Sequence, residues 1–302
     1  MSKNNINQRG FGHLLIPIIV IVLAVVGFAG YKVLKTSTKT ATDKPATANS
    51  EQAKTATTAS WPTSPAITWE ATGDGKWISL PYDTTPPACP DPMSLELPTT
   101  EIKKATSILY PGQSRTGTFE GKGGTYKAHG GIRFDKNSDN NVDVVMPFNG
   151  SVFRASRFLV DGEIQYDFDI ANACGVMIRL GHLRDLTPAF QAIADKLPAA
   201  AEGDSRTTKV TPNIPFKTGD KIATAVGFKT TKNVGFDYGV YDLRTNNEAS
   251  RDAAFNAAHA DTAELTSHGL CWLNLVSNDD KVVLKALPAG DTTSGKTSNY
   301  CK

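Results

Sequence analysis

Two stretches of the chain carry side chains that could hold a metal ion. Residues 129–134 read HGGIRF, and residues 235–242 read GFDYGVYD. Imidazole and carboxylate groups both coordinate zinc, which at a catalytic site takes three protein ligands and keeps one position open for water. A guanidinium group stays protonated and has no lone pair to give, so Arg133 cannot be such a ligand. The two stretches therefore combine two candidate ligands, His129 and Asp237, with a cation that repels a metal.

Five segments in order resemble the lysostaphin/LytM-type zinc metallopeptidases, which are peptidoglycan endopeptidases of bacteria. The segments are 129–134, similar to the family's H-x-G-x-D-f; 143–152 (DVVMPFNGSV), similar to its hairpin; 181–183 (GHL), similar to Y-x-H-L; 217–227 (KTGDKIATAVG); and 235–242, similar to H-L-H-F-E. The resemblance covers about residues 110–243. It implies a mostly β fold, an antiparallel β-sandwich or barrel-like domain with one or two short helices and the metal on one sheet face.

Carried over position by position, the metal site of the family is only partly kept. His129 stands at the first ligand and His182 at the histidine of Y-x-H-L. Arg133 stands in place of the aspartate ligand, Gly235 in place of the first histidine of H-x-H, and Asp237 in place of its metal-binding histidine. We expect Arg133 to form a salt bridge with Asp237 and fill the vacated site. The resemblance thus implies a degenerate member of the family, with no zinc expected.

Three functions follow from this site. The first is a non-catalytic protein that binds wall peptide or a partner protein through the old active-site groove, lined by His129, Arg133, His182 and Asp237; Arg133 would suit a carboxylate of the ligand. Degenerate members of the family that the chain resembles regulate wall hydrolases, and the resemblance implies a similar role here. The second is an active metallo-endopeptidase with an unusual zinc site on His129, His182 and Asp237, in which His182 and His129 are the candidate catalytic residues. The third is a structural envelope module.

A second metal signal follows the first stretch. Oxygen-bearing side chains alternate through the loop: Asp135, Asn137, Asp139, Asn141 and Asp143. This spacing is typical of a calcium loop, although the acidic residue usual at the twelfth position is Met146 here. The pattern predicts a calcium site, with a solvated, Asx-rich turn as the alternative.

An apolar run near the N-terminus predicts attachment to a membrane. Residues 14–31 are almost purely apolar, and at 1.5 Å per residue such a run nearly crosses a hydrocarbon core of roughly 30 Å. We expect a cytoplasmic N-terminus at 1–13, a transmembrane anchor at 14–35 and a disordered polar stalk at 36–60. A cleaved signal peptide and a prepilin-like leader are the alternatives.

Cysteine usage places the rest of the chain outside the cell. Its four cysteines all follow the apolar run, and none forms C-x-x-C. An even number in an anchored chain favours two disulfides in an oxidising compartment over buried free thiols. Three pairings are possible, of which we favour Cys89 with Cys174 and Cys271 with Cys301. We expect a single-pass protein of the cell membrane with an extracellular C-terminal domain.

Composition excludes a nucleic-acid partner. The 32 basic and 30 acidic residues nearly balance, and they form no basic stripe. We expect a Pro-rich N-terminal flap at 61–109, whose three tryptophans pack on the main domain, then the peptidase-like β domain at 110–243 and a helical, disulfide-bonded extension at 244–302. The predicted elements are a hairpin over 142–152 turning at Asn149-Gly150, strands at 163–170, 175–180, 221–226 and 236–243, and helices at 186–197 and 249–265.

Overall fold

The computed structural model describes residues 60–64, 66–96, 98–115 and 125–302. The predicted cytoplasmic N-terminus (1–13), the anchor (14–35) and all of the stalk (36–60) except Ser60 lie outside the described residues. Within the described part of the chain, no helix has both the length and the apolar character needed to cross a membrane.

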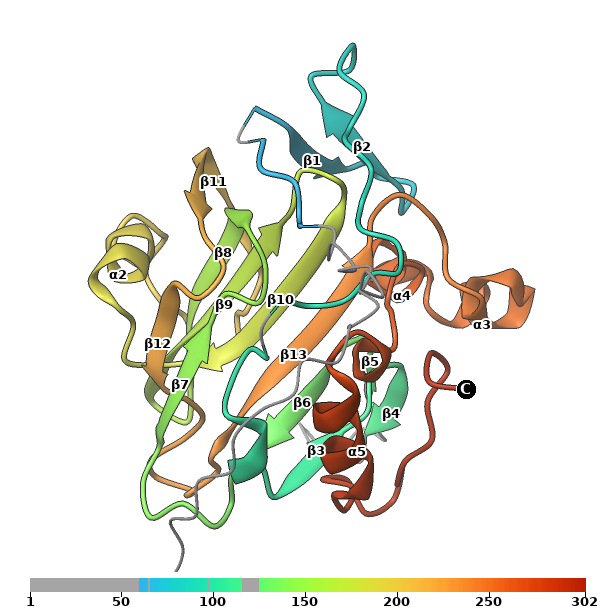
Figure 1. Ribbon diagram of the computed structural model, residues 1–302. Coiled ribbons are helices and arrows are strands. Elements are labelled where there is room, and N and C mark those ends of the chain that lie inside the picture. Colours follow the sequence, from blue (N-terminus) through green and yellow to red (C-terminus); the bar gives the residue numbers. More distant parts are fainter. Residues whose placement is uncertain (1–59, 65, 97, 116–124) are drawn as a thin grey trace, which may run out of the picture. The chain divides into compact units, whose positions relative to one another are not determined.

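The described residues are organised around one seven-stranded antiparallel sheet (Figure 1). Its strands, in spatial order, are β11 (Thr208–Phe216), β8 (Gly150–Val160), β9 (Glu163–Ala171), β10 (Val176–Leu183), β13 (Gly235–Asp242), β6 (Gly130–Arg133) and β3 (Ser107–Leu109). Three two-stranded sheets accompany it: β1 (Thr68–Ala71) with β2 (Trp77–Leu80), β4 (Gln113–Arg115) with β5 (Thr125–Lys127), and β7 (Asn141–Val145) with β12 (Lys221–Ala225). The predicted mostly β, antiparallel fold with few short helices is confirmed.

The two faces of the main sheet have different characters, because side chains alternate along each strand. On β13, Phe236, Tyr238 and Val240 face the larger hydrophobic core, to which β7 and β12 also contribute. The other face carries Asp237 on β13, beside Arg115, and Asp169 on β9, beside Arg154 and Arg179. Asp237, the groove side chain predicted on β13, therefore lies on the polar face, away from the core.

The β1–β2 hairpin covers one end of this polar face. Trp69 and Trp77 pack with Met177 and Tyr241 in a second, smaller core. Arg154 lies with its guanidinium carbon 4.8 Å from the ring centroid of Trp77. The other end of the same strands, where Asp237 stands, is left open by the hairpin.

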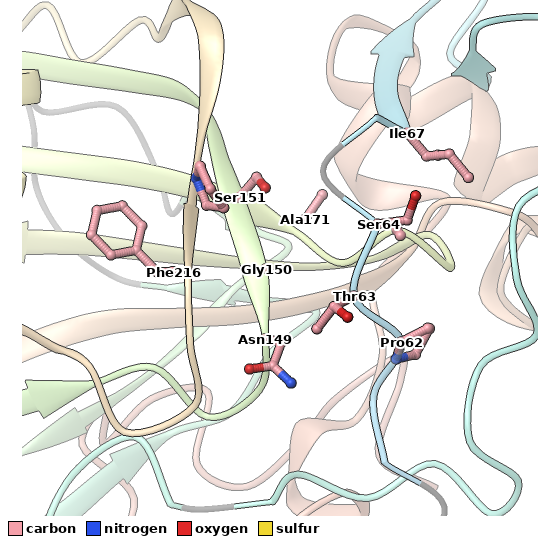
Figure 2. A pocket seen from close by; sticks show the side chains of 11 residues that line it. Pro62, Thr63, Ser64, Ile67, Asn149, Gly150, Ser151, Ala171 and Phe216 are labelled. Carbon is pink, nitrogen blue, oxygen red and sulfur yellow. The ribbon is translucent and has the colours of Figure 1, made fainter.

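The N-terminal flap packs on the main domain as predicted. Trp61, Trp69 and Trp77 are all buried, and Trp61 stacks on Phe148 with ring centroids 4.7 Å apart. Figure 2 shows the segment around Pro62 and Thr63 lying across from the start of β8, with a small cavity between them. The tryptophans therefore serve as packing residues of the fold.

The predicted hairpin over 142–152 is wrong. Strand β7 pairs with β12, whereas β8 pairs with β9 and β11, so the Asn149-Gly150 turn carries the chain between two different sheets. The side chain of Asn149 accepts a hydrogen bond from the backbone N–H of Thr218, a contact across the turn that local sequence does not reveal. The predicted strand pair 163–170 and 175–180 is confirmed as β9 and β10.

The helices are shorter than predicted. The helix expected at 186–197 is α2 (Pro188–Ala194); Thr187 stands at its N-cap position, but its hydroxyl donates to the carbonyl of Lys221 and caps nothing. The helix expected at 249–265 breaks into η2 (Ala249–Arg251), α3 (Ala253–Ala258), η3 (Ala260–Thr262) and α4 (Ala263–Thr266). The remaining ones are η1 (Ile102–Lys104), η4 (Trp272–Asn274) and α5 (Asn278–Ala286).

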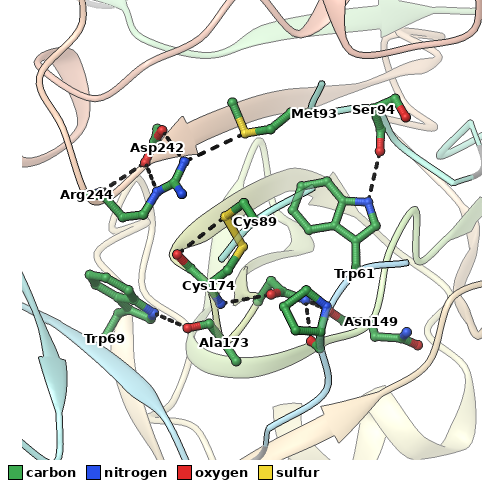
Figure 3. The surroundings of a disulfide bond; sticks show 12 residues. Trp61, Trp69, Cys89, Met93, Ser94, Asn149, Ala173, Cys174, Asp242 and Arg244 are labelled. Atoms are coloured by element: carbon green, nitrogen blue, oxygen red, sulfur yellow. Dashed lines mark hydrogen bonds and ion pairs between the residues drawn. A yellow bond between two sulfur atoms is a disulfide. The ribbon is translucent and has the colours of Figure 1, made fainter. Parts of the chain in front are cut away.

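Both favoured disulfides are confirmed. Cys89 is bonded to Cys174 at the turn between β9 and β10, and Cys271 to Cys301. Figure 3 shows the first bond beside Trp61 and Trp69, where it ties the flap to the main sheet. The second closes the C-terminal extension, whose Trp272 is fully buried in the larger core.

Candidate functional site

Asp237 is the centre of a group of histidine and arginine side chains on the open end of the polar face. His129 Nε2 lies 3.0 Å from Asp237 Oδ2, and His182 Nε2 lies 3.6 Å from the same oxygen. Arg115 Nη1 lies 3.7 Å from Asp237 Oδ1. Three of the four predicted groove residues thus meet at one carboxylate.

Local backbone geometry brings these side chains together. Asp237 pairs with Gly131 of β6 on one side and with Gly181 of β10 on the other, so no neighbouring Cβ crowds its carboxylate. Strand β10 has a bulge after Leu180, and His182 there adopts a φ of 58°. A non-glycine residue in this left-handed region is uncommon and is typical of functional positions. The bulge turns His182 toward Asp237.

The predicted salt bridge between Arg133 and Asp237 is wrong. Arg133 instead pairs with Asp135, two residues along the chain, through Nη2 to Oδ1 at 2.7 Å and Nε to Oδ2 at 3.1 Å. Its cross-strand neighbour is Gly235, where a Cβ atom would lie 3.2 Å from Arg133 Cγ. The cation near Asp237 is Arg115, which also donates a hydrogen bond from Nη2 to the carbonyl of His129 at 2.6 Å.

A second carboxyl group faces Asp237 across β10. Asp167 of β9 and Asp237 of β13 flank Gly181, where a Cβ atom would lie 2.8 Å from Asp167 Oδ1 and 3.2 Å from Asp237 Cβ. The absence of a side chain at Gly181 therefore lets both acidic side chains lean over the middle strand. The side chain of Asp167 makes no hydrogen bond and no ion-pair contact with any described residue, and the charged group that acts on it most strongly is Arg179.

Burial moves the pKa values of these groups apart. Burial lowers the pKa of His129 to about 4, so its imidazole is neutral at pH 7. Burial raises the pKa of Asp167 to about 6. Burial alone would also raise the pKa of Asp237, but His129, His182 and Arg115 together hold it well below its usual range. Asp237 is therefore a fixed anion, while Asp167 titrates just below neutral pH.

These groups line two adjoining cavities that share His182 and Asp237. The larger, of about 340 Å³, is lined by Lys127, His129, Asp167, Arg179, Gly181 and Ser205 in addition, with Phe158 and Val160 as an apolar wall. The smaller, of about 110 Å³, lies toward Arg133 and is lined also by Leu109, Phe228 and Asn233. All four predicted groove residues therefore line this pair of cavities, which we call the β10–β13 groove.

The residues do not fit a zinc ion as they stand. Two imidazoles and a carboxylate are suitable zinc donors. The guanidinium group of Arg115, however, lies beside Asp237 and its permanent positive charge repels a zinc ion at this position. Within the described residues, no three His, Cys, Asp or Glu side chains lie together in an arrangement that could hold a metal ion.

The five residues of the predicted calcium loop are spread over a turn and a strand. Asp135 is held by Arg133, and Asp143 on β7 forms an ion pair of 2.7 Å with Lys221. Asp139 accepts a hydrogen bond from the backbone of Asn141. Asn137, Asn141 and Asp143 line a further cavity. Calcium binding stays a prediction, tested by calorimetry and by the melting temperature with and without calcium.

Two charged residues close to Asp237, Arg115 and Asp167, escaped sequence reasoning. Arg115 lies on β4, a three-residue strand outside every motif. Asp167 lies within a strand that was predicted, and its polar neighbours Gln165 and Asp169 alternate with it at a spacing of two. That alternation marks one polar sheet face and could have identified Asp167.

The comparisons with known proteins return no relative. No protein-family model, no curated protein and no solved structure matches the chain. The resemblance to wall endopeptidases therefore rests on the motifs alone, and the function rests on the geometry of the β10–β13 groove.

Proposed function

We propose that this chain is a membrane-anchored, extracellular protein that binds cell-wall peptide or an envelope protein in the β10–β13 groove without cutting it. The observation that carries the proposal is that the carboxylate of Asp237 is already in contact with other side chains. This residue stands where the resemblance requires a metal-binding histidine, and it is engaged by His129, His182 and the permanent cation of Arg115. A carboxylate already contacted by two imidazoles and paired with a permanent cation is a poor ligand for a divalent cation.

Two further observations support a binding role. The groove keeps the size and character of a ligand site, since a cavity of about 340 Å³ combines an apolar wall with several polar groups. Gly235 has no side chain to act on a bound water, and Arg133 is turned away onto Asp135. The groove thus has the means to hold a ligand and lacks two of the groups that the peptidases it resembles use at their metal site.

The proposed location rests on the sequence and on the disulfides. The apolar run at 14–31 suits an anchor, and two disulfides without a free cysteine suit an oxidising space. The domain that follows the stalk would then face the wall. No feature of the chain points to nucleic acid.

The alternative is a metallo-endopeptidase with zinc on His129, His182 and Asp237. One observation favours it: both imidazoles direct Nε2 toward the same carboxylate oxygen, and Arg133 does not block them. Arg115 would have to move before zinc could enter. This alternative is tested by the same experiment.

The test uses the full chain purified in a mild detergent and incubated with isolated cell-wall sacculi. We expect sedimentation with the sacculi, less than one-tenth of an equivalent of zinc by elemental analysis, and no release of soluble wall peptides. His182→Ala should weaken sedimentation, whereas His259→Ala, a histidine outside the groove, should not. Stoichiometric zinc with chelator-sensitive cleavage would establish the endopeptidase. Absence of both sedimentation and cleavage would leave the structural envelope module.

A further inference from the structure

The charged groups of the larger cavity fall into two classes, those with a partner and those without one. Asp237 contacts His129 and Arg115. Arg179 forms an ion pair of 3.1 Å with the fully buried Asp169, which also binds Arg154 at 3.0 Å. These groups lie within ion-pair distance of one another, so each charge has an opposite charge or an imidazole beside it.

Two charged side chains of the same cavity have no direct contact of this kind, although the charges of Arg179 and His182 act on Asp167 through space. Neither Asp167 nor Lys127 forms a hydrogen bond or an ion pair through its side chain with any residue that the structure describes. One is an anion on β9 and the other a cation on β5. A partly buried charge without a contacting partner is costly to a fold, so two such charges of opposite sign in one cavity indicate a ligand that contacts both.

We propose that the β10–β13 groove binds the zwitterionic end of a short peptide, with an ammonium group at Asp167 and a carboxylate group at Lys127. This inference rests on the proposed function and names the ligand chemistry of that same groove. Gly181 provides the space beside Asp167 that the ammonium group enters, because any side chain there would come within 2.8 Å of Asp167 Oδ1. The apolar wall of Phe158 and Val160 contacts the stem between the two charges.

The electrostatics of the cavity agree with this assignment. Burial raises the pKa of Asp167 to about 6, so most of its carboxyl groups are ionised at pH 7. An ammonium group that replaces the lost hydration shell of this carboxylate forms a charge-assisted hydrogen bond. A neutral ligand would leave both Asp167 and Lys127 desolvated without a charged group in contact.

The test measures binding of three synthetic peptides to the full chain in detergent by calorimetry at pH 7. The first is N-acetyl-Ala-Lys-Ala, which carries one side-chain amine and one terminal carboxylate. The second has the amine acetylated, and the third has the carboxylate amidated. We expect each modification to weaken binding at least tenfold.

Variants assign each charge to its residue. Asp167→Asn should abolish the preference for the free amine and keep the preference for the free carboxylate, and Lys127→Met should do the reverse. Gly181→Ala, which retains both charges but fills the space over β10, should weaken all three peptides. Asp83→Asn and Lys196→Met, at exposed positions outside the groove, are the matched controls and should bind as the unmodified chain does.

Equal affinity for the three peptides, or preferences that persist in Asp167→Asn and Lys127→Met, would overturn the inference. Retained sedimentation with sacculi in that case shows that the groove binds wall material by other contacts, so the proposed function stands while the zwitterion assignment fails. Loss of sedimentation by the unmodified chain removes the proposed function itself.

Discussion

Arg133 and Gly235 are direct cross-strand neighbours, and the side chain of Arg133 lies over the space that Gly235 leaves empty. The two departures from the peptidase motif are thus one structural change. Arg133 stands on β6 where the resemblance would place a ligand, and the glycine opposite it makes room for the long side chain. The guanidinium group then reaches Asp135 and leaves Asp237 to His129, His182 and Arg115.

This pairing predicts a non-additive effect on stability. A histidine at Gly235 would place its Cβ 3.2 Å from Arg133 Cγ, so Gly235→His should lower the free energy of unfolding by about 1–3 kcal/mol through overpacking. Arg133→Ala should recover part of that loss in the double variant, because the carbonyl oxygen of Ile132, 3.1 Å from the same Cβ position, stays in place. Arg133→Ala alone should cost less than about 1 kcal/mol, because its bridge to Asp135 is partly exposed to solvent. Denaturant unfolding of the four proteins measures the coupling, and simple additivity would contradict the pairing.

His129 predicts a loss of stability in mild acid. Its pKa is lowered from 6.5 to about 4 in the folded chain, so the unfolded chain binds more protons between those pH values. Stability from this group is full above pH 6.5 and falls as the pH drops to about 4, by about 3 kcal/mol. His129→Gln should flatten this part of the pH profile of the unfolding free energy. An unchanged slope in the variant would show that another group is responsible.

Asp167 predicts the opposite pH dependence. Its pKa is raised from 3.8 to about 6, so the folded chain binds more protons than the unfolded one in that interval. Its contribution is most favourable below pH 3.8 and is lost as the pH rises through 6. Asp167→Asn should therefore stabilise the protein at pH 8 by about 1–3 kcal/mol and leave it unchanged near pH 3.5.

We expect the Asp167→Asn variant to be more stable and to bind the peptide more weakly, because residues kept for function often lower stability. Thermal melting at the two pH values, with Asp83→Asn as control, distinguishes this from a general effect of removing a negative charge. A variant that is less stable than the unmodified chain at pH 8 would contradict the buried, unpaired state of Asp167.

The two disulfides predict unequal contributions to stability. Cys89–Cys174 closes 85 residues and Cys271–Cys301 closes 30. On the chain-entropy account, removal of the first should cost about 4.6 kcal/mol and removal of the second about 3.7 kcal/mol. Paired Cys→Ser variants, compared by denaturant unfolding, measure both. A larger loss from the shorter loop would indicate that packing around Trp272 and Cys271 outweighs loop closure.

The sequence alone predicted the strands β9, β10 and β13, the presence of two disulfides and the polar positions His129, His182 and Asp237, while it left three cysteine pairings open. These follow from short-range signals: alternation along a strand, an even number of cysteines, and residue types at fixed spacing. The same signals failed at Asn149-Gly150, which has the composition of a hairpin turn but joins two sheets, because strand partners are chosen by burial of whole faces.

Only the tertiary structure decided which charges meet. Arg133 was the nearest cation to Asp237 by motif, yet the cation that lies there is Arg115, because β4 passes beside the sheet and Gly235 lets Arg133 extend to Asp135. Asp167 became a site residue because Gly181 leaves space between two strands far apart in sequence. Interactions between charges depend on distance and burial, and neither is written in the spacing of residues along a chain.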